Sequence, residues 1–216
     1  MTETIRKTMD ALRKNNMQAY FVQTKEDVVP LVRTLLSKGD TVTHGGSVTL
    51  GECGIPALLS NGDYHYLDRN AEGLTREQIL DIYQKTFSAD VFFTSANAIT
   101  ENGLLYNVDG NSNRTAAILY GPKSVIIIAG YNKIVPDIHA AVNRLKTIAA
   151  PLNTQRLRCK TPCAHTGKCI AADKPDSLLA DGCQSPERIC CNYVVSAQQR
   201  HKDRIKVILV GETLGY

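Results

Sequence analysis

Short runs of apolar and β-branched residues alternate along this chain with segments that carry helical periodicity. Ile5, Met9 and Leu12, for example, recur at the spacing of one helix face, and a β-prone run follows them. The β-prone runs in the second half are apolar on both sides, as in strands that helices cover on both faces. The alternation predicts an α/β fold, with a Rossmann-like, mostly parallel sheet and flanking helices.

Caps, turn residues and periodicity predict the individual elements. The expected helices are 3–16, 25–37, one that starts near 49, 75–87, and a long one that opens at 136 and that Pro151 ends or kinks. The expected strands are 19–23, 40–44, 64–67, 91–94, 104–108, 116–120, 124–129 and 205–210. The density of strands between 104 and 129 favours some antiparallel pairing there.

The chain of 216 residues has the length of one large domain. Residues 1–158 are expected to form its α/β core. Residues 159–191 hold six of the seven cysteines and have little apolar periodicity, so we expect an excursion from that core. Residues 192–216 contain a further apolar run, which predicts a C-terminal strand that returns to the same domain.

Composition argues against several classes of protein. The net charge is only +4 and there is no Trp, which disfavours nucleic-acid binding. Residues 1–16 lack the apolar core of a signal peptide, and the longest apolar run, 125–129, is far too short for a membrane span. We therefore expect a cytoplasmic protein whose cysteines are reduced or bind metal. Composition leaves open whether it forms an oligomer.

A glycine-rich loop follows the expected strand that ends at position 44. Gly45 and Gly46 let the backbone approach a ligand closely, and Ser47 and Thr49 add hydroxyl donors. Such a loop at the carboxyl end of a strand predicts a site for a phosphate, a carboxylate or a CoA-type anion. The alternative is a tight turn in which Ser47 caps the next helix. Lys133 is a further candidate for contacting the anion, or a surface lysine.

A second polar loop follows a strand in the middle of the chain. It contains Glu101, which can act as a base, a nucleophile or a hydrogen-bond acceptor. Asn113 and Arg114 come next, and an arginine can hold a carboxylate through two parallel hydrogen bonds. We expect Ser47, Glu101 and Arg114 to share one cleft at the carboxyl edge of the sheet. The structural alternative is a polar hairpin in which Glu101 and Arg114 form an ion pair.

The cysteine excursion contains four candidate metal ligands, Cys163, Cys169, Cys183 and Cys190. Four thiolates can bind zinc tetrahedrally or hold an iron–sulfur cluster, and His165 offers a nitrogen alternative. A segment poor in apolar residues needs a cross-link to order it, which a metal can supply. Three interpretations stay open: a structural metal site, a redox cluster, or free thiols.

Four segments, in this order along the chain, resemble motifs of the LUD-domain (lactate utilisation) family. They are Gly-Gly-Ser-Val-Thr-Leu at 45–50, Thr-Glu-Asn-Gly at 100–103, Gly-Asn-Ser-Asn-Arg at 110–114 and Gly-Tyr-Asn-Lys-Ile-Val at 130–135. A related subfamily has a cysteine pattern that residues 161–169 and 183–190 fit, with 170–182 as an insertion.

The resemblance implies a fold like that of ribose-phosphate isomerases and CoA transferases. It also implies a part in the oxidation of lactate or a similar 2-hydroxy acid, as a subunit beside iron–sulfur oxidoreductase partners. In related folds the glycine loop cradles an anion and an acidic residue, here Glu101, is the nucleophile or base. Two alternatives stay open: a non-catalytic metal-binding scaffold or electron-transfer adaptor, and an isomerase or CoA-transferase-like enzyme.

Overall fold

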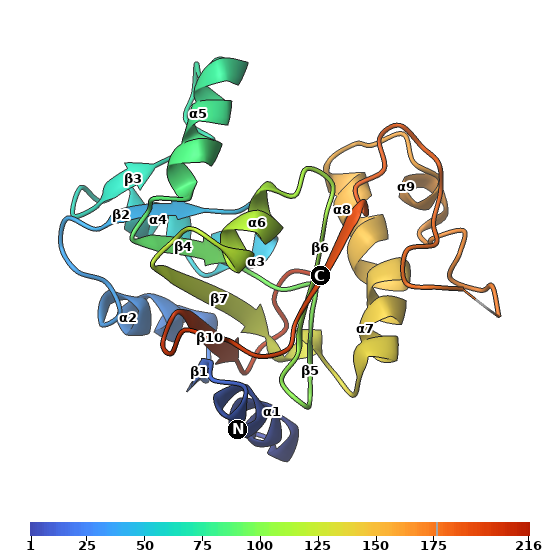
Figure 1. Ribbon diagram of the computed structural model, residues 1–216, viewed down its shortest axis with the longest axis horizontal. Coiled ribbons are helices and arrows are strands. Elements are labelled where there is room, and N and C mark those ends of the chain that lie inside the picture. The colour runs from blue at the N-terminus through green and yellow to red at the C-terminus, as the bar shows by residue number, and fades with distance from the viewer. Residues whose placement is uncertain (176) are drawn as a thin grey trace.

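Six parallel strands form the main sheet in a computed structural model that describes residues 1–175 and 177–216 (Figure 1). Their order in the sheet is β1-β10-β7-β4-β2-β3, and every neighbouring pair is parallel. The strands are β1 (Gln18–Val22), β2 (Thr41–His44), β3 (His65–Leu67), β4 (Val91–Thr94), β7 (Ser124–Gly130) and β10 (Ile205–Val210). The mostly parallel α/β fold expected from the alternation is confirmed.

Helices cover both faces of this sheet because its side chains are apolar on both. Along β7, Val125 and Ile127 pack on one face, whereas Ile126 and Ile128 pack on the other. The first face is covered by α1 (Glu3–Lys14) and α6 (Asn113–Leu119). The second face is covered by α2 (Val28–Arg33), α3 (Val48–Glu52) and α4 (Ile55–Leu59). In the part of the chain that the structure describes, no helix is long and apolar enough to cross a membrane.

A second sheet, in the order β8-β5-β6-β9, contains the antiparallel pairing expected in the middle of the chain. Its strands are β5 (Ala98–Thr100), β6 (Leu105–Asp109), β8 (Ile134–Val135) and β9 (Asn192–Ser196). The side chains of Ala98, Tyr106 and Val108 pack from this sheet onto α7 (Ile138–Arg144) and the helical turns that follow it.

One expected strand is wrong: residues 116–120 lie mostly in α6. The carboxylate of Asp109 accepts the N–H of Thr115 at 2.8 Å, which satisfies the first turn of this helix. Gly121, with φ of +107°, then turns the chain after the helix. A Cβ at Gly121 would lie 2.7 Å from the backbone of Phe87, so the turn also needs a glycine for space.

The long helix expected from position 136 is present as three consecutive pieces. α7 runs into a π-helical turn (Leu145–Ala149), and α8 (Ala150–Arg156) follows directly. Pro151 lies in the first turn of α8, so it follows the break and does not end the helical stretch. A separate helix, α5 (Arg76–Thr86), projects from the body of the molecule (Figure 1).

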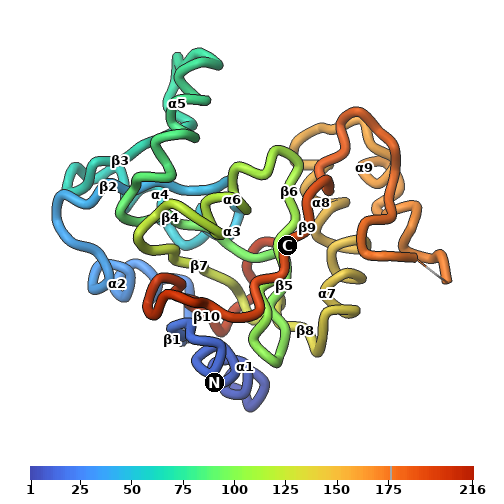
Figure 2. Tube along the Cα trace, viewed as in Figure 1, coloured from blue at the N-terminus to red at the C-terminus, as the bar shows by residue number. Residues whose placement is uncertain are grey.

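Residues 159–175 and 177–191, which include the short α9 (Pro162–Thr166), wind beside α7 and α8 (Figure 2). The Arg188 guanidinium holds this segment together, because it donates to the carbonyls of Ala180, Cys183 and Cys190 at 2.6, 2.9 and 2.8 Å. Lys146 adds bonds to Ser177 Oγ and the Leu178 carbonyl. Bonds from these two cations, mostly to backbone carbonyls, thus order a stretch that has few apolar side chains.

Candidate functional site

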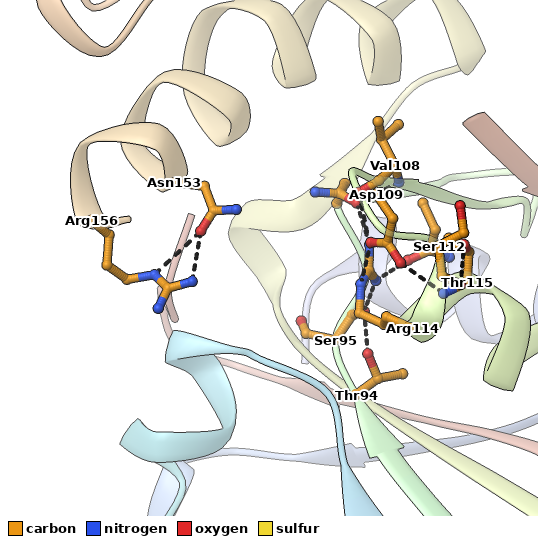
Figure 3. Close-up of polar contacts among 11 residues, drawn as sticks. Thr94, Ser95, Val108, Asp109, Ser112, Arg114, Thr115, Asn153 and Arg156 are labelled. Carbon is orange, nitrogen blue, oxygen red and sulfur yellow. Dashed lines mark hydrogen bonds and ion pairs between the residues drawn. The ribbon is translucent and has the colours of Figure 1, made fainter. Parts of the chain in front are cut away.

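A cleft of about 690 Å³ lies at the carboxyl edge of the main sheet. Its walls include residues 46–49 after β2, residues 95–97 after β4, and Lys133 after β7. Asn153 and Arg156 of α8, together with residues 186–190, line it from the other side. Figure 3 shows the Asn153–Arg156 pair and, apart from it, the polar cluster around Asp109 and Arg114.

Cations outnumber carboxylates around this cleft. The basic residues that line it are Arg69, Arg114, Lys133, Arg156 and Arg188. The acidic ones are Asp109 and Glu187. A concave surface with this excess of positive charge attracts and concentrates anions.

Arg114 lines the cleft but its hydrogen-bonding capacity is already used. Its guanidinium forms an ion pair with Asp109 at 2.8 Å, and both side chains are about one-tenth exposed. It also donates to the Ser95 and Val108 carbonyls and to the amide oxygens of Asn97 and Asn107, at 2.7–3.1 Å. A guanidinium has five N–H donors, so Arg114 positions the loops around it and does not offer a free clamp.

The glycine loop lies where the sequence predicted it, and two arginine side chains pack against its glycines. A Cβ at Gly45 would lie 3.2 Å from the side-chain carbons of Arg114, and one at Gly46 would lie 2.6 Å from Arg69 Nη2. Ser47 Oγ accepts the N–H of Leu50 at 3.3 Å, so Ser47 also caps α3. Gly46, Ser47 and Thr49 line the cleft, whereas Gly45 lies behind it against Arg114.

Arg69 is a cleft residue that the sequence reasoning missed. Its Nη1 donates to the Tyr83 hydroxyl at 3.1 Å, and its guanidinium lies 5.6 Å from the centre of that ring. Its Nε is buried and has no hydrogen-bond partner within the part of the chain described. Position 69 lies two residues after the end of β3, and residues 45–49 likewise follow the end of β2, so this placement at a strand end was the available signal.

Lys133 is almost completely buried at the cleft wall, with 3% exposure. Its Nζ donates to Thr49 Oγ1 and to Ser95 Oγ, each at 2.9 Å. Burial, and then the neighbouring charges of Arg144 and Arg114, lower the pKa of Lys133 to about 7. Asn113 also lines the cleft, at the start of α6.

Glu101 does not lie in this cleft, so the expected grouping of Ser47, Glu101 and Arg114 is wrong. β5 carries the chain away from the sheet edge, and the turn after it packs against α1. There Glu101 forms an ion pair with Lys7 at 2.7 Å, beside a separate hollow. The alternative, an ion pair between Glu101 and Arg114, is wrong as well, because Glu101 pairs with Lys7 and Arg114 pairs with Asp109.

The structure brings together the four cysteines that were predicted as ligands. Cys163, Cys169, Cys183 and Cys190 all line one small, mostly apolar cavity of about 20 Å³. Cys163 and Cys183 are buried there, and the other two are half-buried. His165 is exposed and does not line this cavity. Within residues 1–175 and 177–216, no three His, Cys, Asp or Glu side chains are already placed to hold a metal.

Comparisons with known proteins agree with this fold. The structure is similar to that of a DUF162 family protein from Deinococcus radiodurans, with a TM-score of 0.53, 13% identity and 96% of each chain covered. It is also similar to eIF2B beta from Chaetomium thermophilum, with a TM-score of 0.35, 17% identity, and coverage of 53% of this chain and 40% of that one. No curated protein matched. The LUD domain family matches residues 5–210. The chain therefore belongs to the LUD-domain family.

Proposed function

We propose that this protein takes part in the use of lactate or a similar 2-hydroxy acid and that its cleft binds a small organic anion. The observation that carries the proposal is a pair of cations on the cleft wall, Arg69 and Lys133, that have no ion-pair partner among the residues that the structure describes. Family membership supports the lactate connection, because the family is broadly associated with lactate utilisation.

Arg69 is the residue that we assign to the carboxylate of the ligand. Its side chain lines the cleft, and its buried Nε has no hydrogen-bond partner among the described residues, which is costly for a buried donor. Arg156 adds positive charge from α8, where its bonds go to the neutral oxygens of Asn153 and Tyr216. Arg114 positions the loop residues Ser95 and Asn97 that form the wall.

The alternative of an acyl-CoA transferase or isomerase requires a carboxylate nucleophile or base in the cleft. Glu101 lies elsewhere, Asp109 is paired with Arg114, and Glu187 accepts the N–H of Lys160. A binding function, or chemistry that uses Lys133, therefore fits the cleft better than carboxylate catalysis does.

Isothermal titration calorimetry tests the anion site with lactate, pyruvate, inorganic phosphate and CoA. We expect lactate or pyruvate to bind the wild-type protein, and Arg69→Met to weaken this binding at least tenfold. Arg33→Met is the matched control, because Arg33 is exposed on α2, away from the cleft. Failure of all four compounds to bind would remove the proposal.

A second candidate function is supported by the four cysteines around one cavity. We propose that Cys163, Cys169, Cys183 and Cys190 bind zinc or an iron–sulfur cluster after a small rearrangement of their side chains. Four thiols in a mostly apolar cavity are a suitable donor set. A structural metal would order the segment, and a cluster would supply electron transfer to iron–sulfur partner subunits.

Elemental analysis of protein purified without oxygen tests the cysteine site. We expect zinc or iron in the wild type, its loss in Cys183→Ser, and its retention in Cys191→Ser. Cys191 is the matched control because it belongs to the same segment, is exposed, and does not line the cavity. A metal-free wild type, or equal metal content in both variants, would contradict this second proposal.

A further inference from the structure

On the basis of the proposed anion site, we infer that Lys133 binds a 2-oxo acid covalently, by forming an imine between its amine and the carbonyl carbon. This deepens the proposed function, since it assigns the ligand class and the reacting atom. The argument starts from the surroundings of the amine.

The partners of the Lys133 amine are two hydroxyl groups. Nζ donates to Thr49 Oγ1 and Ser95 Oγ, each at 2.9 Å. No ion pair involves Lys133 anywhere in the part of the chain described. Two hydroxyls orient the amine, but they do not stabilise its protonated form as a carboxylate does.

The charges around Lys133 favour its neutral form. After burial, Arg144 and Arg114 are the main influences that lower its pKa to about 7. Glu52 and Cys53 act in the opposite direction, and the Glu52 carboxylate already accepts the N–H of Gly215 at 2.7 Å. A neutral, desolvated lysine amine is a nucleophile toward carbonyl carbon, whereas an exposed lysine is almost entirely protonated at neutral pH.

The loop after β2 contacts both side chains that we assign to a 2-oxo acid, Arg69 and Lys133. Gly46 lies against Arg69 Nη2, and Thr49, three residues later, accepts the bond from Lys133 Nζ. Arg69 and the Lys133 amine therefore contact the same short loop, one being proposed for the carboxylate and the other for the adjacent carbonyl. The 2-oxo acid has both groups on neighbouring carbons, whereas a 2-hydroxy acid lacks the carbonyl.

The reaction requires no oxidant. The amine lone pair attacks the carbonyl carbon, a C–N bond forms, and a proton moves from nitrogen to the carbonyl oxygen to give a carbinolamine. Protonation of that hydroxyl lets it leave as water, and the imine remains. The hydroxyls of Thr49 and Ser95 lie within hydrogen-bond distance of the nitrogen and can pass these protons.

The test is reductive trapping of the full-length protein with pyruvate and sodium cyanoborohydride at pH 7, followed by peptide mass mapping. We expect the reduced pyruvate adduct on Lys133, with roughly tenfold or more label than on any other lysine. Lactate and phosphate should give no adduct. Lys133→Arg should remove the label, whereas Lys146→Arg, at another buried lysine outside the cleft, should keep it.

Peptide mapping of the wild type shows whether Lys133 carries the adduct, even if a variant fails to fold. An adduct spread evenly over surface lysines, or none on Lys133 while calorimetry shows that pyruvate binds, would overturn this inference alone. Absence of both pyruvate binding and trapping would overturn the proposed anion site and this inference together.

Discussion

We expect Arg114→Met to lower the free energy of unfolding, and not only to weaken ligand binding. The change removes the ion pair with Asp109, in which both side chains are about one-tenth exposed. It also leaves the carbonyls of Ser95 and Val108 and the amide oxygens of Asn97 and Asn107 without this donor. Asp109 retains one bond, from the N–H of Thr115.

The size of the effect follows from the burial of that pair. Removing one partner of a buried, hydrogen-bonded ion pair costs about 3–5 kcal/mol in free energy of unfolding. Total stabilities of domains are about 5–15 kcal/mol, so the loss is a large part of the whole. For a chain of this length it corresponds to a fall in Tm of roughly 6–20 °C.

Urea denaturation monitored by circular dichroism measures this change, with Arg156→Met as the control. Arg156 lines the same cleft but is exposed, so its loss should change the free energy of unfolding by no more than about 0.5 kcal/mol. A stable Arg114→Met variant that loses only anion binding would refute the reasoning, because Arg114 would then be a ligand clamp.

Four further predictions concern the cleft and its surroundings. Gly46→Ala should displace the Arg69 guanidinium, 2.6 Å from the new Cβ, and calorimetry should show weaker anion binding. Glu101→Gln should leave anion binding unchanged and cost at most about 1 kcal/mol in urea denaturation, because its partner Lys7 is 64% exposed. Lactate binding should tighten as pH falls through about 7, because Lys133 then gains its proton. Folding lowers that pKa, so the unfolded chain binds more protons above pH 7. Stability should therefore rise from pH 7 to 9 by more in the wild type than in Lys133→Met, as urea titrations can measure.

The central strands of the main sheet could be predicted because they are nearly continuous apolar runs. β4 and β7 were located by composition alone, since both faces of each strand are buried. The loop after β2 was predicted from its two glycines and two hydroxyl residues at the end of an expected strand. Arg69 lies at the corresponding place after β3. No glycine is next to it, and the sequence therefore does not mark this strand end as a binding loop.

The features that the sequence did not predict depend on contacts between segments that are distant in the chain. The run at 116–120 is apolar enough for a strand. The Asp109 carboxylate, however, accepts the N–H of Thr115 and stabilises the first turn of a helix there. Glu101 follows a short strand that pairs with β8, and this pairing carries it to α1. The cysteine spacing indicated a shared site, yet the carbonyl bonds of Arg188 that bring the segment together have no sequence signature.

A crystal structure of the protein soaked with pyruvate tests the central claim most directly. We predict difference density in the cleft of about 690 Å³, with the carboxylate against Arg69 and the carbonyl carbon next to Lys133 Nζ. Density only at the protein surface, or a cleft that stays solvent-filled at pyruvate concentrations that saturate any calorimetric signal, would contradict the account.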